Sequence, residues 1–138
     1  MTVASGKTLG YGKIHDVLLY ISAKRPPNDA DWAEYVAFFR KAEQPNFRGI
    51  VVERGSGPNA AQRKQITDIM STVTSKVAVM SASPVARGVM TAMSWFSKGF
   101  QAFSPDEMDR ALEYLGVPSL MATQVKQLVQ KIQQELDY

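Results

Sequence analysis

Short runs of strand-forming apolar residues alternate with longer amphipathic segments along most of this chain. The apolar runs occupy residues 17–21, 47–53, 76–80 and 100–103, and a segment with helical periodicity follows each of them. A strand followed by a helix, repeated several times, predicts a largely parallel sheet with right-handed crossovers. We therefore expect an α/β fold with a mostly parallel central sheet of about four to five strands and about five helices.

The N-terminal strand signals are bounded by residues that stop strands or begin helices. The Ile-Val-Val run at 50–52 has no polar alternation, which is typical of a strand buried on both faces. Prolines 26 and 27 end the first run, and Asn28 or Asp29 can cap the helix that follows it. Residues 11–15 predict an additional antiparallel edge strand before the first run.

The C-terminal third of the chain contains two further helix signals. Ser104 and Glu107 predict a capping box with Pro105 in the first turn, and Gly116 suits the left-handed residue that ends such a helix. A last helix is expected over residues 119–136. Its apolar stripe faces either the core or a partner, and consists of Val125, Leu128, Val129, Ile132 and Leu136.

Length and composition narrow the class of protein. A chain of 138 residues predicts a single domain, which we place at residues 11–138 after a polar, flexible leader at 1–10. The absence of cysteine excludes disulfides, thiolate metal sites and cysteine nucleophiles, and fits a cytoplasmic location. The net charge is +3 and the cations are scattered, which favours a mixed solvated surface over a nucleic-acid interface. No apolar stretch is long enough for a transmembrane segment.

Two small-residue turns are the candidate binding site. Gly55-Ser56-Gly57 and Ser81-Ala82-Ser83 each follow a predicted strand and precede a helix. In a parallel sheet such turns lie at the carboxyl ends of the strands, where free amides and the helix dipole favour an anion. Arg54 and Arg87 can add charge-assisted hydrogen bonds. The alternative is that Ser56, Ser83 and Asn59 only cap helices and that the glycines only form turns.

The order of elements and the C-terminal sequence resemble STAS-like domains, the fold of anti-sigma-factor antagonists and of the cytoplasmic parts of sulfate transporters. The resemblance covers roughly residues 17–117, and its most specific part is residues 100–115, which contain the run Phe-Ser-Pro-Asp-Glu-Met-Asp-Arg-Ala-Leu-Glu-Tyr-Leu. In bacterial regulatory members, a Ser or Thr in an Asp-Ser-(Ser/Thr)-Gly turn is phosphorylated. Ser56 stands at the corresponding place, although Arg54 and Gly55 replace the family's Asp and Pro58 follows.

The resemblance and the two turns predict a non-enzymatic regulatory or scaffold module that binds another protein, with phosphorylation at Ser56 as its switch. A kinase is one candidate partner, and a second copy of the chain in a homodimer is another. The alternative is a domain that binds a small anionic ligand or a lipid headgroup near Arg54 and Arg87. An enzyme has the least support, because the sequence offers no nucleophile–base pair, metal cluster or cofactor fingerprint. We therefore expect no cofactor and no metal; His15 and the acidic residues at 106–109 have ordinary structural explanations.

Overall fold

The computed structural model describes residues 3–5, 8–42, 47–54, 58–70, 76–83 and 99–136. Strands and helices alternate through most of this part of the chain, as the sequence predicts. In chain order the elements are β1 (Val3–Ser5), β2 (Leu9–Ile14), β3 (Val17–Ser22), α1 (Asp29–Ala42), β4 (Arg48–Glu53), α2 (Ala60–Met70), β5 (Lys76–Ser81), β6 (Phe100–Phe103), α4 (Met108–Leu115) and α5 (Ser119–Glu135). The helix predicted after Pro84 lies outside the described residues.

All of these strands belong to one six-stranded sheet in the order β1-β2-β3-β4-β5-β6. Strands β3 to β6 are parallel, whereas β1 and β2 form antiparallel pairs at one end. The predicted antiparallel strand at 11–15 corresponds to β2, but it is not the edge, because β1 pairs along its outer side. Part of the predicted leader, residues 3–5 and 9–10, is therefore paired in the sheet.

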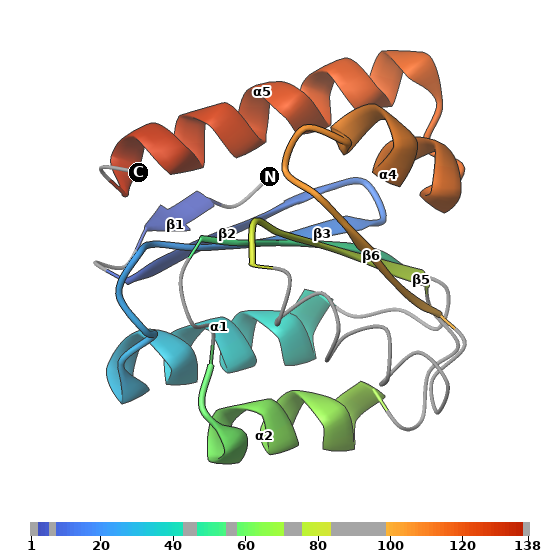
Figure 1. The fold of residues 1–138 in the computed structure, drawn as a ribbon. Coiled ribbons are helices and arrows are strands. Elements are labelled where there is room, and N and C mark those ends of the chain that lie inside the picture. The colour runs from blue at the N-terminus through green and yellow to red at the C-terminus, as the bar shows by residue number, and fades with distance from the viewer. Residues whose placement is uncertain are drawn as a thin grey trace.

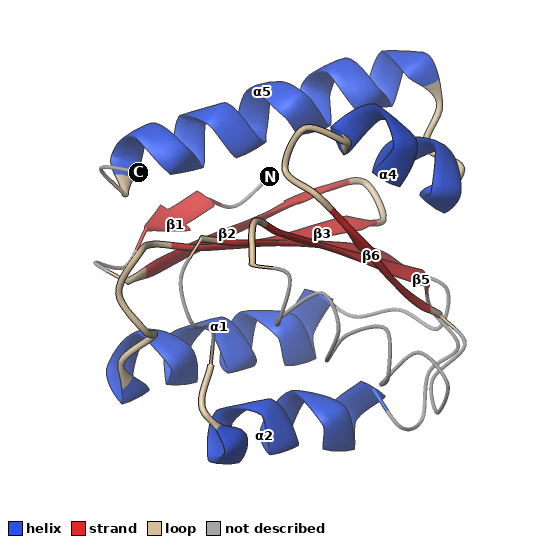
Figure 2. Cartoon of the chain, in the orientation of Figure 1, coloured by secondary structure: helices blue, strands red, loops and turns tan. Residues whose placement is uncertain are grey.

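The sheet lies between two layers of helices (Figures 1 and 2). Helices α1 and α2 cover one face, and α4 and α5 cover the other. The parallel strands follow one another in space as they do in sequence, so right-handed crossovers place α1 and α2 on the same face. The C-terminal helices cover the opposite face, because its apolar side chains would otherwise be exposed to water.

Alternate residues of the central strands enter two separate cores. In β3, Leu18 and Tyr20 pack toward α1, while Leu19 and Ile21 belong to the cluster that α4 and α5 complete. All four side chains are buried. Burial on both faces was predicted for the Ile-Val-Val run of β4, where Ile50 and Val52 are buried in the second of these clusters and Val51 is half-buried against the first.

The start of α4 differs from the prediction. The helix begins at Met108, and residues 104–107 form a turn in which the Glu107 amide donates to the Ser104 carbonyl. The Glu107 carboxylate accepts the Ser104 amide at 2.8 Å, but the Ser104 hydroxyl donates to the acidic side chains instead of accepting a helix amide. Only one half of the predicted capping box therefore forms. These hydrogen bonds lower the pKa of Glu107. Gly116 ends the helix at φ 69°, as predicted.

Helix α5 packs its apolar stripe against the sheet. Val125, Leu128, Val129 and Ile132 are buried in the same cluster as the inward side chains of β3, β4 and β5. The stripe therefore serves the core of this chain, which was one of the two predicted roles. No helix in the described ranges is both long enough and apolar enough to cross a membrane.

A pair of leucines on α5 tests this role. We expect Leu128→Ala to lower the free energy of unfolding by about 2–5 kcal/mol, because its side chain is only 4% exposed. Leu120→Ala removes the same atoms from a side chain that is 82% exposed, and should change stability by less than about 0.5 kcal/mol. Urea unfolding followed by circular dichroism measures both values. Equal losses for the two variants would show that α5 is not docked on the sheet.

Candidate functional site

The carboxyl ends of β4 and β5 lie beside each other at one edge of the sheet, where the described part of the predicted site begins. Glu53, the last residue of β4, is in register with Ser81, the last residue of β5. The loops that follow these strands therefore leave the sheet side by side, as the sequence predicts. Of the predicted residues, Arg54, Asn59, Ser81 and Ser83 are described, whereas Gly55, Ser56, Gly57 and Arg87 lie outside the described residues.

Asn59 caps the N-terminus of α2. Its side-chain oxygen accepts the Gln62 amide at 2.8 Å, and the Gln62 side-chain oxygen accepts the Asn59 amide at 2.9 Å. The capping role that the sequence offered as the alternative for Asn59 is therefore present. Gln62 is buried, and its side-chain nitrogen also donates to the Pro27 carbonyl at 3.1 Å and to Asp29 at 3.2 Å. Gln62 therefore joins the starts of α1 and α2. This residue was not identified from the sequence, although its position three residues after Asn59 is the spacing of a capping box.

Two buried serines hold the backbone where the strands end. The Ser22 hydroxyl accepts the Arg54 amide, and the Ser81 hydroxyl accepts the Ser83 amide, each at 3.2 Å. Both serine side chains are buried, so these hydroxyls satisfy main-chain amides at the turn. Arg54 itself is exposed at the edge, and Ser83 is half-buried.

The sheet topology also affects what this edge can bind. Open α/β sheets form a ligand crevice where the strand order reverses and helices diverge to opposite faces. From β3 to β6 the order runs without a reversal. The strand order in the described part of the chain therefore does not produce such a crevice at the carboxyl edge.

Glu53 carries the unusual electrostatics of this edge. Burial raises the pKa of its carboxyl group, and the nearby Arg63 guanidinium partly opposes that rise in pKa. The Tyr20 hydroxyl is buried without a hydrogen-bond partner in the described structure, and burial together with the Glu53 charge raises the pKa of this phenol. Burial has this effect on the pKa of Glu53 because it removes hydration from the ionised carboxylate.

The elevated pKa of Glu53 predicts a pH-dependent effect of Glu53→Gln. Since the folded chain holds this proton to a higher pH than the unfolded chain, the parent protein loses stability as the pH rises through the folded pKa. We expect Glu53→Gln to be stabilising relative to the parent at pH about 7 and to lose that advantage well below the carboxyl pKa. Thermal melts at both pH values measure the difference. Glu113→Gln, at an exposed position on α4, is the control; an equal pH dependence in both variants would contradict the assignment.

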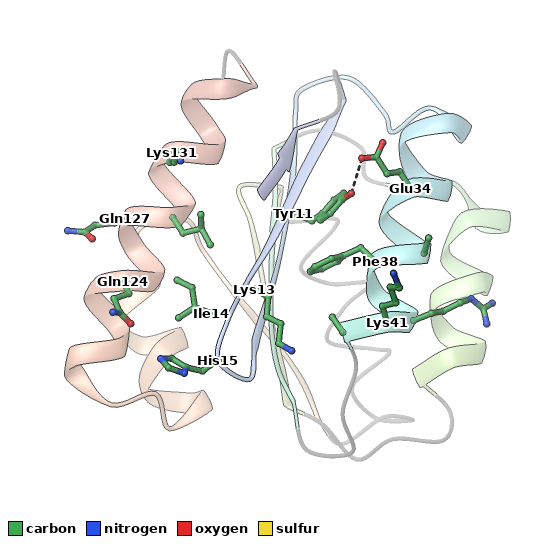
Figure 3. Close-up of a pocket in the computed structure, with 14 residues that line it drawn as sticks. Tyr11, Lys13, Ile14, His15, Glu34, Phe38, Lys41, Gln124, Gln127 and Lys131 are labelled. Carbon is green, nitrogen blue, oxygen red and sulfur yellow. Dashed lines mark hydrogen bonds between the residues drawn. The ribbon is translucent and has the colours of Figure 1, made fainter. Parts of the chain in front are cut away.

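A groove of about 1440 Å³ lies away from this edge, along β2 and between α1 and α5 (Figure 3). It is near the amino ends of the parallel strands, because Ile14 of β2 pairs with the first residue of β3. The polar and charged side chains that line it are Tyr11, Lys13, His15, Glu34, Arg40, Lys41, Gln124, Gln127 and Lys131.

The wall of the groove on the α1 side is well ordered by polar and aromatic contacts. The Tyr11 hydroxyl donates to Glu34 at 2.9 Å, and the rings of Tyr11 and Phe38 lie 4.5 Å apart between their centroids. Burial and the neighbouring carboxylate raise the pKa of Tyr11 to about 12. The phenol therefore stays protonated at neutral pH and keeps Glu34 engaged as an acceptor.

The groove escaped the sequence analysis because its cations come from distant segments. Lys13 belongs to β2, Arg40 and Lys41 belong to the last turn of α1, and Lys131 belongs to α5. No local run of charge marks these positions in the sequence. Only the packing of α1 and α5 on the two sides of β2 brings them together (Figure 3).

The described residues contain no group of three or more His, Asp and Glu side chains placed to hold a metal ion. Comparisons of the chain with protein-family models, with curated proteins and with solved structures found no match. The function must therefore be argued from the two surfaces described above.

Proposed function

We propose that this chain is a non-enzymatic regulatory module of the STAS-like kind, which binds another protein through the carboxyl edge of its sheet. The position of the turn that contains Ser56 carries the proposal. Ser56 belongs to the segment between the end of β4, at Glu53, and the start of α2, at Ala60, and Glu53 is in register with Ser81 at the end of β5. Ser56 thus stands between a strand end and a helix N-terminus, where a regulatory serine of the resembled family would stand.

The charges around this turn suit a phosphate on Ser56. The first turn of α2 contains no acidic residue, so a new anion would meet the positive end of the helix dipole. Arg54 follows β4 directly, and the Arg63 guanidinium donates to the Pro58 carbonyl at 3.2 Å, which holds it beside the turn. A phosphoserine adds nearly two negative charges, and it would change the potential of the docking edge.

The alternative function is the binding of a small anionic ligand or lipid headgroup at the same edge. The same helix terminus and the same guanidinium groups support it. The buried serine hydroxyls favour the first proposal, since Ser22 and Ser81 already accept main-chain amides. A partner protein can bind to a surface that offers few free polar groups, because it also contributes apolar contacts.

Replacing Ser56 by an acidic residue tests the regulatory function. We expect Ser56→Asp to leave the melting temperature unchanged within about 2 °C and to change the set of partners retained from the native host. Affinity capture followed by mass spectrometry identifies the partners, and the intact mass of the natively purified chain reports phosphorylation. Ser56→Ala should resemble the unphosphorylated chain.

Thr123→Asp is the matched control, because Thr123 is exposed on α5, on the other face of the sheet. It adds the same charge away from the carboxyl edge. Identical partner sets for Ser56→Asp, Thr123→Asp and the parent would contradict the proposed switch.

A further inference from the structure

We propose that the groove along β2 is a second binding site, separate from the Ser56 turn, and that it takes an acidic and partly apolar segment of a partner protein. The groove has cationic side chains on both of its walls, and its accessible apolar side chains lie on the α1 side. It is open along one side, and it is formed by three elements that belong to the described part of the fold, β2, α1 and α5 (Figure 3). The inference does not require the Ser56 switch to exist.

The charge of the groove selects an anionic partner. Lys13, Arg40, Lys41 and Lys131 line it, and within the described structure none of these cations has a carboxylate partner. The acidic residue among the lining side chains, Glu34, accepts the Tyr11 hydroxyl. The groove therefore has an excess of positive charge. An acidic segment would replace water around these cations with complementary charge and would be steered toward them.

Apolar residues make the groove suitable for more than a simple anion. On the α1 side of the groove, Ala37 is exposed and Phe38 is half-buried, whereas Ile14 and Leu128 on the α5 side are buried in the core. Phe38 is half-buried, so part of its ring remains available to a ligand. A segment that carries aliphatic side chains beside its acidic ones would cover this surface and remove it from water.

The size and the ring packing distinguish a protein segment from other anions. Small-molecule pockets usually measure roughly 300–1,000 Å³, whereas this groove measures about 1440 Å³. Its cations lie on elements on either side of β2 and do not converge on one point, as a site for a single phosphate would require. A single-stranded nucleic acid would need free ring faces for stacking. The rings of Tyr11 and Phe38 instead pack against each other.

Fluorescence anisotropy with a labelled peptide of alternating glutamate and leucine tests the site on the full chain. The groove variant combines Lys13→Gln, Arg40→Gln and Lys41→Gln. The matched control combines Lys64→Gln, Lys76→Gln and Arg110→Gln, which removes the same charge from exposed positions that do not line the groove. We expect the groove variant to bind the peptide about tenfold more weakly or worse, and the control variant to change the affinity less than about twofold. Thermal melts verify that both variants are folded.

Three outcomes would overturn the proposal. An equal loss of affinity in both variants would mean that net charge alone attracts the peptide. Unchanged binding of a peptide with glutamine in place of glutamate would remove the role of charge. Tighter binding of a single-stranded DNA of the same charge, or of vesicles that contain anionic lipid, would assign the groove to another class of partner. The capture of partners by the Ser56 variants is a separate measurement. A negative result in the peptide-binding experiment would therefore not contradict the function proposed for the Ser56 turn.

Discussion

The burial of the parallel strands on both faces is the constraint on which the rest of this structure depends. Leu19 and Ile21 of β3 point into one core, and Leu18 and Tyr20 of the same strand point into the other. A single helix layer would leave one of these sets in water, at a cost of roughly 25 cal/mol for each square ångström of apolar surface. The chain therefore needs α5 as much as it needs α1, although α5 joins no pair of strands.

The in-order arrangement of the strands decides where binding surfaces can form. Because β3 to β6 follow each other without a reversal, the loops after β4 and β5 leave one edge beside each other. The polar side chains there are largely used by the fold itself, as Asn59 and Gln62 illustrate through their reciprocal hydrogen bonds. The same order leaves β2 near the end of the sheet with α1 and α5 on its two sides, and this produces the groove.

The sequence predicted features that depend on local patterns. The strands, the apolar stripe of α5 and the left-handed Gly116 each follow from periodicity or from the conformational freedom of one residue, whereas the side on which the stripe packs was left open. It did not predict β1, because a strand of three residues, Val3–Ser5, carries no period that could be recognised. It also missed the groove, since Lys13 and Lys131 become neighbours of one cavity only through tertiary packing. The Ser56 turn remains a prediction from sequence.

The two proposed sites lie on a sheet that is covered on both faces by helices. A phosphate at Ser56 would meet a helix terminus that Gln62 already ties to Pro27 and Asp29. Its effect would then be a change of surface potential at the carboxyl edge. Most of that potential is screened within about 10 Å in salt. The groove is near the amino ends of the parallel strands, so a phosphate at Ser56 would change the binding of a partner segment in the groove only weakly. The two surfaces are therefore suited to independent contacts with the same or different proteins.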